Sequence, residues 1–148
     1  MISKRLADDM KVAMKAGDKV KLGVIRMLRA ELKNAQIAAG DTLPEEIEEK
    51  VLSSYAKKLK ESKDQYLEAG RKDLADKEET EYDITMSYLP PRMETAELAE
   101  LIRAKIEETG AAGVSDFGLV MKAVMQSAGS RVDGSIVSGM VKKHLSGG

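Results

Sequence analysis

The sequence contains no cysteine, no tryptophan and a single histidine among its 148 residues. Without cysteine, the protein has no disulfides, no thiolate metal ligands and no thiol nucleophile. The single imidazole, His144, excludes the clusters of histidine ligands that hold transition metals. We therefore expect neither a metal centre nor a cofactor.

Long hydrophobic runs are missing as well. No apolar stretch approaches the roughly 18 residues that a membrane-spanning helix needs. The first six residues, Met1 to Leu6, lead directly into mixed charge and do not resemble a signal peptide. Apolar residues are still plentiful enough for a core, because 43% of the chain is hydrophobic. We expect a soluble, cytoplasmic protein with no membrane contact.

The net charge of −1 identifies no partner, but the charges are unevenly distributed along the chain. Residues 1–40 carry nine basic and four acidic side chains, whereas residues 41–90 carry eight basic and fourteen acidic ones. Residues 91–148 carry seven of each kind. Packed helices cancel part of such fields, so this segregation is weak support for a charged binding surface.

Proline is scarce, and its three positions, 44, 90 and 91, leave long stretches without a helix breaker. Apolar residues recur at spacings of three and four, which is the periodicity of amphipathic helices. Four helices are predicted before Pro90, at about residues 3–16, 18–39, 44–70 and 73–87. Three shorter helices are predicted after Pro91, near residues 98–109, 115–128 and 133–145.

Several polar residues stand where helix caps are expected. Ser3, Asp18 and Asp73 precede predicted helices, and Thr42 and Glu45 have the spacing of a capping box. Glycines follow the last apolar residue of several helices, as is typical of helix ends. They are Gly17, Gly40, Gly70, Gly110 and Gly129.

The segment Tyr88-Leu89-Pro90-Pro91 is the clearest boundary in the sequence. Two consecutive prolines remove two backbone donors and push the preceding residue out of the helical region. No strand-like alternation exceeds a few residues. We predict an all-α protein with an N-terminal domain over residues 1–89, a bundle of about four helices that includes one long helix. A small three-helix domain over residues 93–148 is predicted to follow.

Most catalytic signatures are absent from the sequence. It has no Walker A loop, no Gly-x-Gly-x-x-Gly after a strand and no Gly-x-Ser-x-Gly elbow. Glu78 and Glu81 share a helical face, and close carboxylates can serve acid–base catalysis, but a charge-rich helix face is usually solvated. His144 is similarly either a general base or a polar residue that favours a helix C-terminus. We predict no catalytic residues.

The C-terminal part carries the most unusual chemistry. Glycines near helix N-termini, Gly118 among them, let backbone N–H groups face an anion, which the helix dipole favours. Basic residues surround these turns, namely Lys122, Arg131, Lys142 and Lys143. A phosphate backbone is one candidate ligand for this group. The alternative is that the glycines are only turn residues and that Asp133 is only a helix cap.

Two sets of residues also carry a family resemblance. The first is Gly70-Arg71-x-Asp73-Leu74 with Glu78, Glu81 and Tyr88-Leu89-Pro90. The second is Asp116-x-Gly118-x-Val120-Met121, followed by Gly129, Arg131, Asp133-Gly134, Val137, Val141 and Leu145. Together they resemble the YqeY-like proteins of the GatB/YqeY family over nearly the whole chain. The resemblance implies two helical domains, the smaller being a three-helix bundle.

Members of this family are similar to the tail of the B subunit of the tRNA-dependent amidotransferase. That enzyme is a carbon–nitrogen ligase with glutamine as amido donor, and its tail helps to hold tRNA. This chain departs from the family pattern at two positions, where Leu119 and Pro91 stand in place of lysines. Both departures remove positive charge.

Two functions follow as hypotheses. The resemblance implies a non-catalytic tRNA-binding accessory module, acting alone or beside an amidotransferase or an aminoacyl-tRNA synthetase. The alternative is a protein-interaction module that docks a partner through its long helices without nucleic acid. Amidotransferase activity of the chain itself is not expected, because transamidation needs ATP activation and a glutaminase nucleophile, and the sequence shows neither site.

Overall fold

The computed structural model describes residues 1–147, and in this range it contains helices and loops but no strand. The prediction of an all-α fold is confirmed. The first four α-helices are α1 (Ile2–Ala16), α2 (Lys19–Ala39), α3 (Glu45–Glu68) and α4 (Lys72–Met86). The remaining ones are α5 (Thr95–Thr109), α6 (Phe117–Ala128) and α7 (Gly134–Leu145), with short 3-10 helices η1 (Val114–Asp116) and η2 (Gly129–Arg131) on either side of α6.

The chain forms two compact units, the first spanning Met1–Pro90 and the second beginning at Pro91. We call them the N-terminal unit and the C-terminal unit. Each has its own hydrophobic core, and no buried residue is shared between the two cores.

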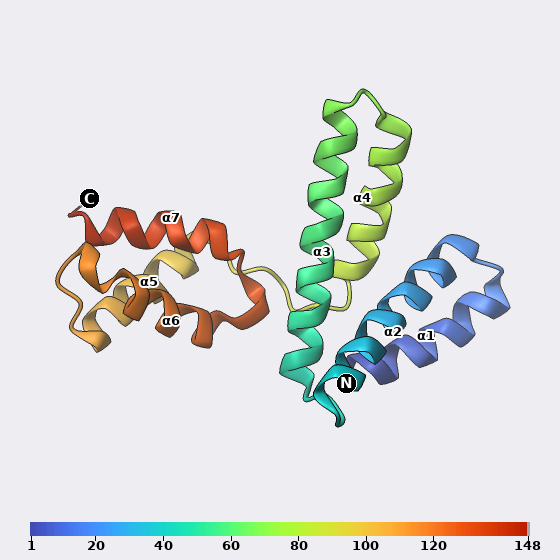
Figure 1. Cartoon of the computed structure of the whole chain (residues 1–148), viewed down its shortest axis with the longest axis horizontal. Helices are drawn as coiled ribbons and strands as arrows, with labels where there is room; N and C mark the ends of the chain where they lie inside the picture. Colours follow the sequence, from blue (N-terminus) through green and yellow to red (C-terminus); the bar gives the residue numbers. More distant parts are fainter. Residues whose placement is uncertain (148) are drawn as a thin grey trace. The chain divides into compact units, whose positions relative to one another are not determined.

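The N-terminal unit consists of two helical hairpins, α1–α2 and α3–α4 (Figure 1). The apolar stripes of these helices meet in one core, whose fully buried members include Leu6, Ile25, Leu28 and Leu52. Burying side chains of this size from water is the main stabilising term of such a bundle. The chain then leaves α4 through Tyr88 and Leu89, which are buried in the same core.

The C-terminal unit packs α5, α6 and α7 around a smaller core. Ile102 of α5 lies at its centre, together with β-branched residues from the other two helices. These residues are Val120, Val124, Val137 and Val141, and each is completely buried.

The helix ends match the sequence prediction at some positions and differ at others. Asp18 accepts a hydrogen bond from the Lys21 N–H and caps α2 as predicted. The capping box of Thr42 and Glu45 does not form, because Pro44 is the N-cap of α3 and makes no side-chain cap. Asp73 lies inside the first turn of α4 instead of capping it. Ser3 likewise lies within α1, and its N–H donates to Glu48.

Candidate nucleic-acid interface

The start of α6 and the end of α7 bring two of the predicted phosphate-binding residues, Gly118 and Lys142, close together. Lys142 of α7 places its Nζ 5.4 Å from the centroid of the Phe117 ring, over the first residue of α6. Gly118 follows Phe117 directly and is exposed, as is Lys122 one helical turn later. Neither Lys122 nor Lys142 forms an ion pair with a carboxylate within residues 1–147.

Within the described residues, the backbone at this end of α6 has no carboxylate partner. No side chain caps the first turn of α6. Asp116 precedes the helix, but its Oδ2 accepts from the Ala112 N–H at 2.9 Å, outside the helix. Gly118 has no side chain, and a Cβ added there would meet nothing within 4 Å. The 3-10 helix η1 runs directly into α6, and the Phe117 N–H donates to the Val114 carbonyl oxygen, so backbone and not a carboxylate covers this turn.

Lys143 lies beside Lys142 in the last turn of α7 and is exposed. Cations at this position interact favourably with the negative end of the helix dipole, so they are stabilised without an acidic partner. His144 completes the turn, and its Nδ1 lies 2.8 Å from the Met140 carbonyl oxygen. The structure thus places His144 as a residue of the helix C-terminus, in agreement with the structural interpretation of the sequence.

Arg131 lies apart from the other four predicted residues. It precedes α7, so about eight residues of helix, roughly 12 Å, separate the start of α7 from Lys142. Its Nε donates to the Pro91 carbonyl oxygen at 3.0 Å, and its Nη2 lies 3.4 Å from Oε2 of Glu97. The Met93 N–H donates to the Arg131 carbonyl at 2.9 Å. Arg131 therefore fastens the segment before α5 to the η2 turn.

The motif residues of the N-terminal unit also have structural tasks. Gly70 adopts a left-handed conformation (φ 72°) between α3 and α4. Next to it, the Arg71 guanidinium donates twice to the Asp73 carboxylate, at 3.2 and 3.1 Å. This pairing lowers the pKa of Asp73. The motif thus forms the turn of the α3–α4 hairpin.

Tyr88 anchors the end of the N-terminal unit. Its hydroxyl donates to Asp9 of α1, and the Arg5 guanidinium lies 5.0 Å from its ring centroid. Arg5 also donates to the backbone carbonyls of Tyr88 and Ser87. Burial, followed by the hydrogen bond to Asp9, raises the pKa of Tyr88 well above its ordinary value. Sequence reasoning missed this cluster, since its partners lie about 80 positions apart.

The acidic residues of α4 are only partly solvated. Glu79 and Asp83 are exposed, whereas Glu78 and Glu81 are half-buried. Burial, and next the charge of Glu78, raises the pKa of Glu81. Burial, and then the charges of Glu81, Glu31 and Glu78, raise the pKa of Tyr55 on α3. Within residues 1–147 no cluster of three histidine, cysteine, aspartate or glutamate side chains is arranged to hold a metal ion.

Taken together, the structure within residues 1–147 is all-helical and forms two units, the second with Lys142 over the start of α6. The family model described as Yqey-like protein matches residues 3–145, and the chain belongs to this family. The family resemblance of the sequence motifs is thereby confirmed.

Two curated relatives carry the same name, "Altered inheritance of mitochondria protein 41, mitochondrial". The protein from Pyrenophora tritici-repentis is 30% identical over 142 residues, which cover 94% of this chain and 78% of the relative. The protein from Vanderwaltozyma polyspora is 38% identical over 87 residues, which cover 57% of this chain and 46% of the relative.

These names correct one prediction. The prediction of a cytoplasmic location is contradicted, because both relatives are named as mitochondrial proteins. The start of a chain reports only on the segment that is present, and composition alone does not separate one aqueous compartment from another. No helix within residues 1–147 is both long enough and apolar enough to cross a membrane.

Proposed function

We propose that this protein is a non-catalytic accessory module that binds tRNA through the start of α6 and the end of α7. The single observation that carries the proposal is the position of Lys142 over Phe117, next to exposed Gly118 and unpaired Lys122. Lys143 extends the same positive surface. The amidotransferase tail that the family resembles supports RNA as the ligand, and an amidotransferase or an aminoacyl-tRNA synthetase is the partner proposed beside it.

The exposed position of Leu119 adds support for this location. Leu119 follows Gly118 and is 52% exposed, so a side chain at this position reaches solvent. It stands where the family pattern has a lysine. A lysine there would add a cation to the same turn, and the loss of this charge predicts modest affinity.

The test is a titration of labelled tRNA with the full chain at two salt concentrations. We expect salt-sensitive binding, with about 0.7–0.9 units of log–log slope for each phosphate neutralised. Lys122→Gln should weaken binding and reduce this slope, and Leu119→Lys should tighten binding. Arg103→Gln is the matched control, because Arg103 is an exposed basic residue on α5 of the same unit. Absence of salt-sensitive binding in the wild type, or equal losses in both charge-removing variants, would refute the proposal.

The non-catalytic part of the proposal has a separate test. Purified protein should neither release ammonia from glutamine nor hydrolyse ATP above the background of a mock purification. The half-buried pair Glu78 and Glu81 is the obvious candidate for unrecognised chemistry. Turnover that disappears in Glu81→Gln would show that this pair is catalytic.

A second candidate function, docking of a protein partner, is favoured by one feature of α2. Val20 and Met27 lie seven residues apart on one face of this helix and are 60% and 49% exposed. Such a face suits a partner helix. Capture of a protein from cell lysate that survives nuclease treatment, and is lost in Met27→Lys, would favour this function over tRNA binding.

A further inference from the structure

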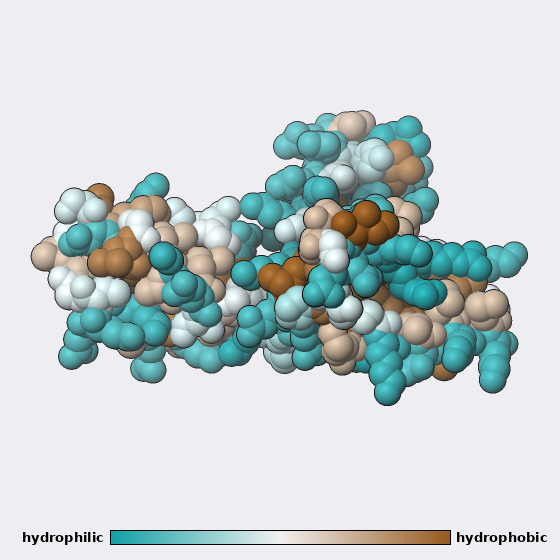
Figure 2. All heavy atoms as spheres, turned by 60° about the horizontal axis from the view of Figure 1, so that its bottom comes forward, coloured by the Kyte–Doolittle hydropathy of each residue, from teal (hydrophilic) through white to brown (hydrophobic). Residues whose placement is uncertain are grey.

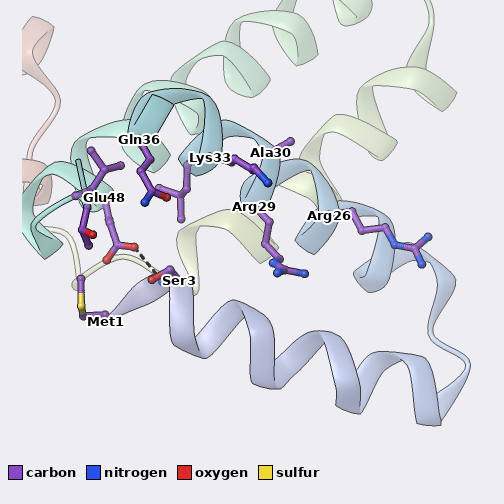
Figure 3. Close-up of a pocket in the computed structure, with 11 residues that line it drawn as sticks. Met1, Ser3, Arg26, Arg29, Ala30, Lys33, Gln36 and Glu48 are labelled. Carbon is purple, nitrogen blue, oxygen red and sulfur yellow. Dashed lines mark hydrogen bonds between the residues drawn. The ribbon is translucent and has the colours of Figure 1, made fainter. Parts of the chain in front are cut away.

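The N-terminal unit contains a pocket of about 460 Å³ that none of the features above uses. It lies between the start of α1, one face of α2 and the first turns of α3 (Figure 3). Its lining combines cations, one carboxylate, small polar groups and apolar surface. The residues that line it are Met1, Ser3, Arg26, Arg29, Ala30, Leu32, Lys33, Gln36, Thr42, Leu43 and Glu48.

Three cations of α2 form one end of this pocket. Arg26, Arg29 and Lys33 follow one another at spacings of three and four, so they share a face of the helix. All three are exposed, and within the described residues none forms an ion pair with a carboxylate. Of the three, Arg29 makes a side-chain hydrogen bond, in which its Nη1 donates to the Met10 Sδ at 3.0 Å. On the face of this unit seen in Figure 2, hydrophilic side chains cover much of the surface, with apolar residues between them.

Glu48 forms the other end. It is the only charged residue that is buried within residues 1–147, with 2% of its surface exposed. Its Oε2 accepts from the Ser3 N–H at 3.1 Å and so satisfies one N–H of the first turn of α1. Its Oε1 has no hydrogen-bond partner. A buried carboxylate oxygen without a donor is costly, and a ligand that brings a donor removes this cost.

Met1 lines the pocket at the same end as this oxygen. Less than 1 Å² of Oε1 is exposed, and Figure 3 shows Met1 next to Glu48 at this end of the pocket. Met1 is itself 52% exposed. A donor group reaches Oε1 only if a side chain at this end of the pocket moves, and the flexible Met1 is the candidate.

The two ends define the ligand. Unpaired arginine and lysine side chains bind phosphate, and arginine also stacks on planar bases. A carboxylate accepts hydrogen bonds from ribose hydroxyls, as in dinucleotide-binding sites. Apolar walls from Leu32 and Leu43 suit the body of a ligand between these ends. We propose that this pocket binds a nucleoside monophosphate unit, either a free nucleotide or one nucleotide of an RNA strand. Its phosphate lies on Arg26, Arg29 and Lys33, and its sugar or base donates to Glu48.

In the experiment, 5′-AMP and inorganic phosphate are titrated separately into the full chain. Binding is measured by calorimetry and by changes in the amide NMR signals. Arg26→Gln combined with Lys33→Gln removes two phosphate contacts and should weaken AMP binding at least about tenfold. Lys57→Gln combined with Lys60→Gln is the matched control, since both lysines are exposed on α3 and neither lines the pocket. This control should change the affinity less than about twofold, because distant exposed charges are screened by salt.

Glu48→Gln tests the other end. The amide oxygen can still accept from Ser3, while the amide nitrogen replaces the free oxygen and turns an acceptor into a donor. AMP binding should weaken about fivefold or more, and phosphate binding should not. A melting curve shows whether this variant is folded. Comparing the affinities of the wild type for AMP and for inorganic phosphate also tests whether the sugar or base contributes to binding, without any substitution at Glu48.

The outcomes separate clearly. No AMP binding by the wild type, or equal losses in the two double variants, overturns the site. Equal affinity for AMP and inorganic phosphate overturns the nucleotide as ligand. A 5′-hydroxyl RNA tetranucleotide then separates the two sources: displacement of AMP indicates a nucleotide within RNA, no displacement indicates a free nucleotide, and both support the pocket. The result is independent of the tRNA titration, whose variants all lie in the C-terminal unit.

Discussion

The two units differ in what their basic residues do. In the N-terminal unit, the arginines that contact the boundary and turn motifs are occupied: Arg5 lies against Tyr88, and Arg71 pairs with Asp73. Three cations of α2 that line the pocket are unpaired within residues 1–147, and they lie at positions outside the family motifs. In the C-terminal unit, the motif residue Arg131 is paired with Glu97. Lys122, which directly follows the motif residue Met121, has no ion pair in the part of the chain that the structure describes. A motif residue is thus not necessarily a binding residue. A cation that already has a partner in the protein is structural, whereas an unpaired cation is available to a ligand.

The largest expected effect is the loss of stability when a core residue of one unit is truncated, which tests whether the two units unfold separately. Ile102 is completely buried in the C-terminal unit, so Ile102→Ala should destabilise that unit by about 2–5 kcal/mol. Hydrogen exchange should show loss of protection in α5–α7 and native protection in α1–α4. Leu28→Ala in the N-terminal unit is the mirror experiment. Loss of protection throughout the chain in either variant would show that the two cores unfold together.

A second difference between the units concerns alkaline pH, because all four tyrosines lie in residues 1–90. The pKa of Tyr88 is raised in the folded protein, while an unfolded tyrosine has a pKa near about 10. The unfolded state therefore loses its proton first. The stabilisation is fully present below about pH 10, and above this value the free energy of unfolding falls by up to about 1.4 kcal/mol per pH unit for this group.

The measurement is denaturant unfolding of the wild type and Tyr88→Phe between pH 8 and 11. At pH 8 the variant should be less stable by about 1 kcal/mol, owing to the lost hydrogen bond to Asp9. The difference should shrink above about pH 10. A constant difference across this range would contradict the assigned role of Tyr88. Tyr55, whose pKa is also raised, contributes in the same direction.

Local sequence patterns predicted the helices well but not the contacts between them. Periodicity and glycine stops gave the all-α fold, and Gly17, Gly40 and Gly110 each end a helix with a positive φ. Capping was less predictable, because Glu48 on α3 serves the first turn of α1 across 45 positions. The candidate site shows the same limit. The sequence analysis placed Arg131 and Lys142 in one site, whereas the length of α7 separates them. No local sequence pattern predicted the pocket around Glu48.

A smaller effect is expected from the anchor before α5. Arg131→Ala removes the donor to the Pro91 carbonyl and the contact with Glu97, at a cost of about 1 kcal/mol. The Met93 N–H, which donates to the backbone of Arg131, should exchange faster, and proteases should cut more readily around residues 89–95. Arg131→Lys keeps the charge but loses the planar fork, so it should restore little of this protection. Unchanged exchange at Met93 in the alanine variant would refute the anchoring role.

The smallest effect is expected from the ion pair in the α3–α4 turn, although it belongs to the most recognisable motif of the N-terminal unit. Arg71 and Asp73 are both exposed, so water and salt screen their attraction and the pair adds little to stability. Arg71→Gln should leave the melting temperature unchanged within error at moderate salt. Gly70→Ala, in contrast, should lower it clearly, because the left-handed backbone at this position strains any residue with a Cβ. The turn would then depend on its backbone and not on its charges. A clear loss of stability in Arg71→Gln that disappears at high salt would show instead that this arginine is held in place for its charge, as the unpaired cations of α2 are proposed to be.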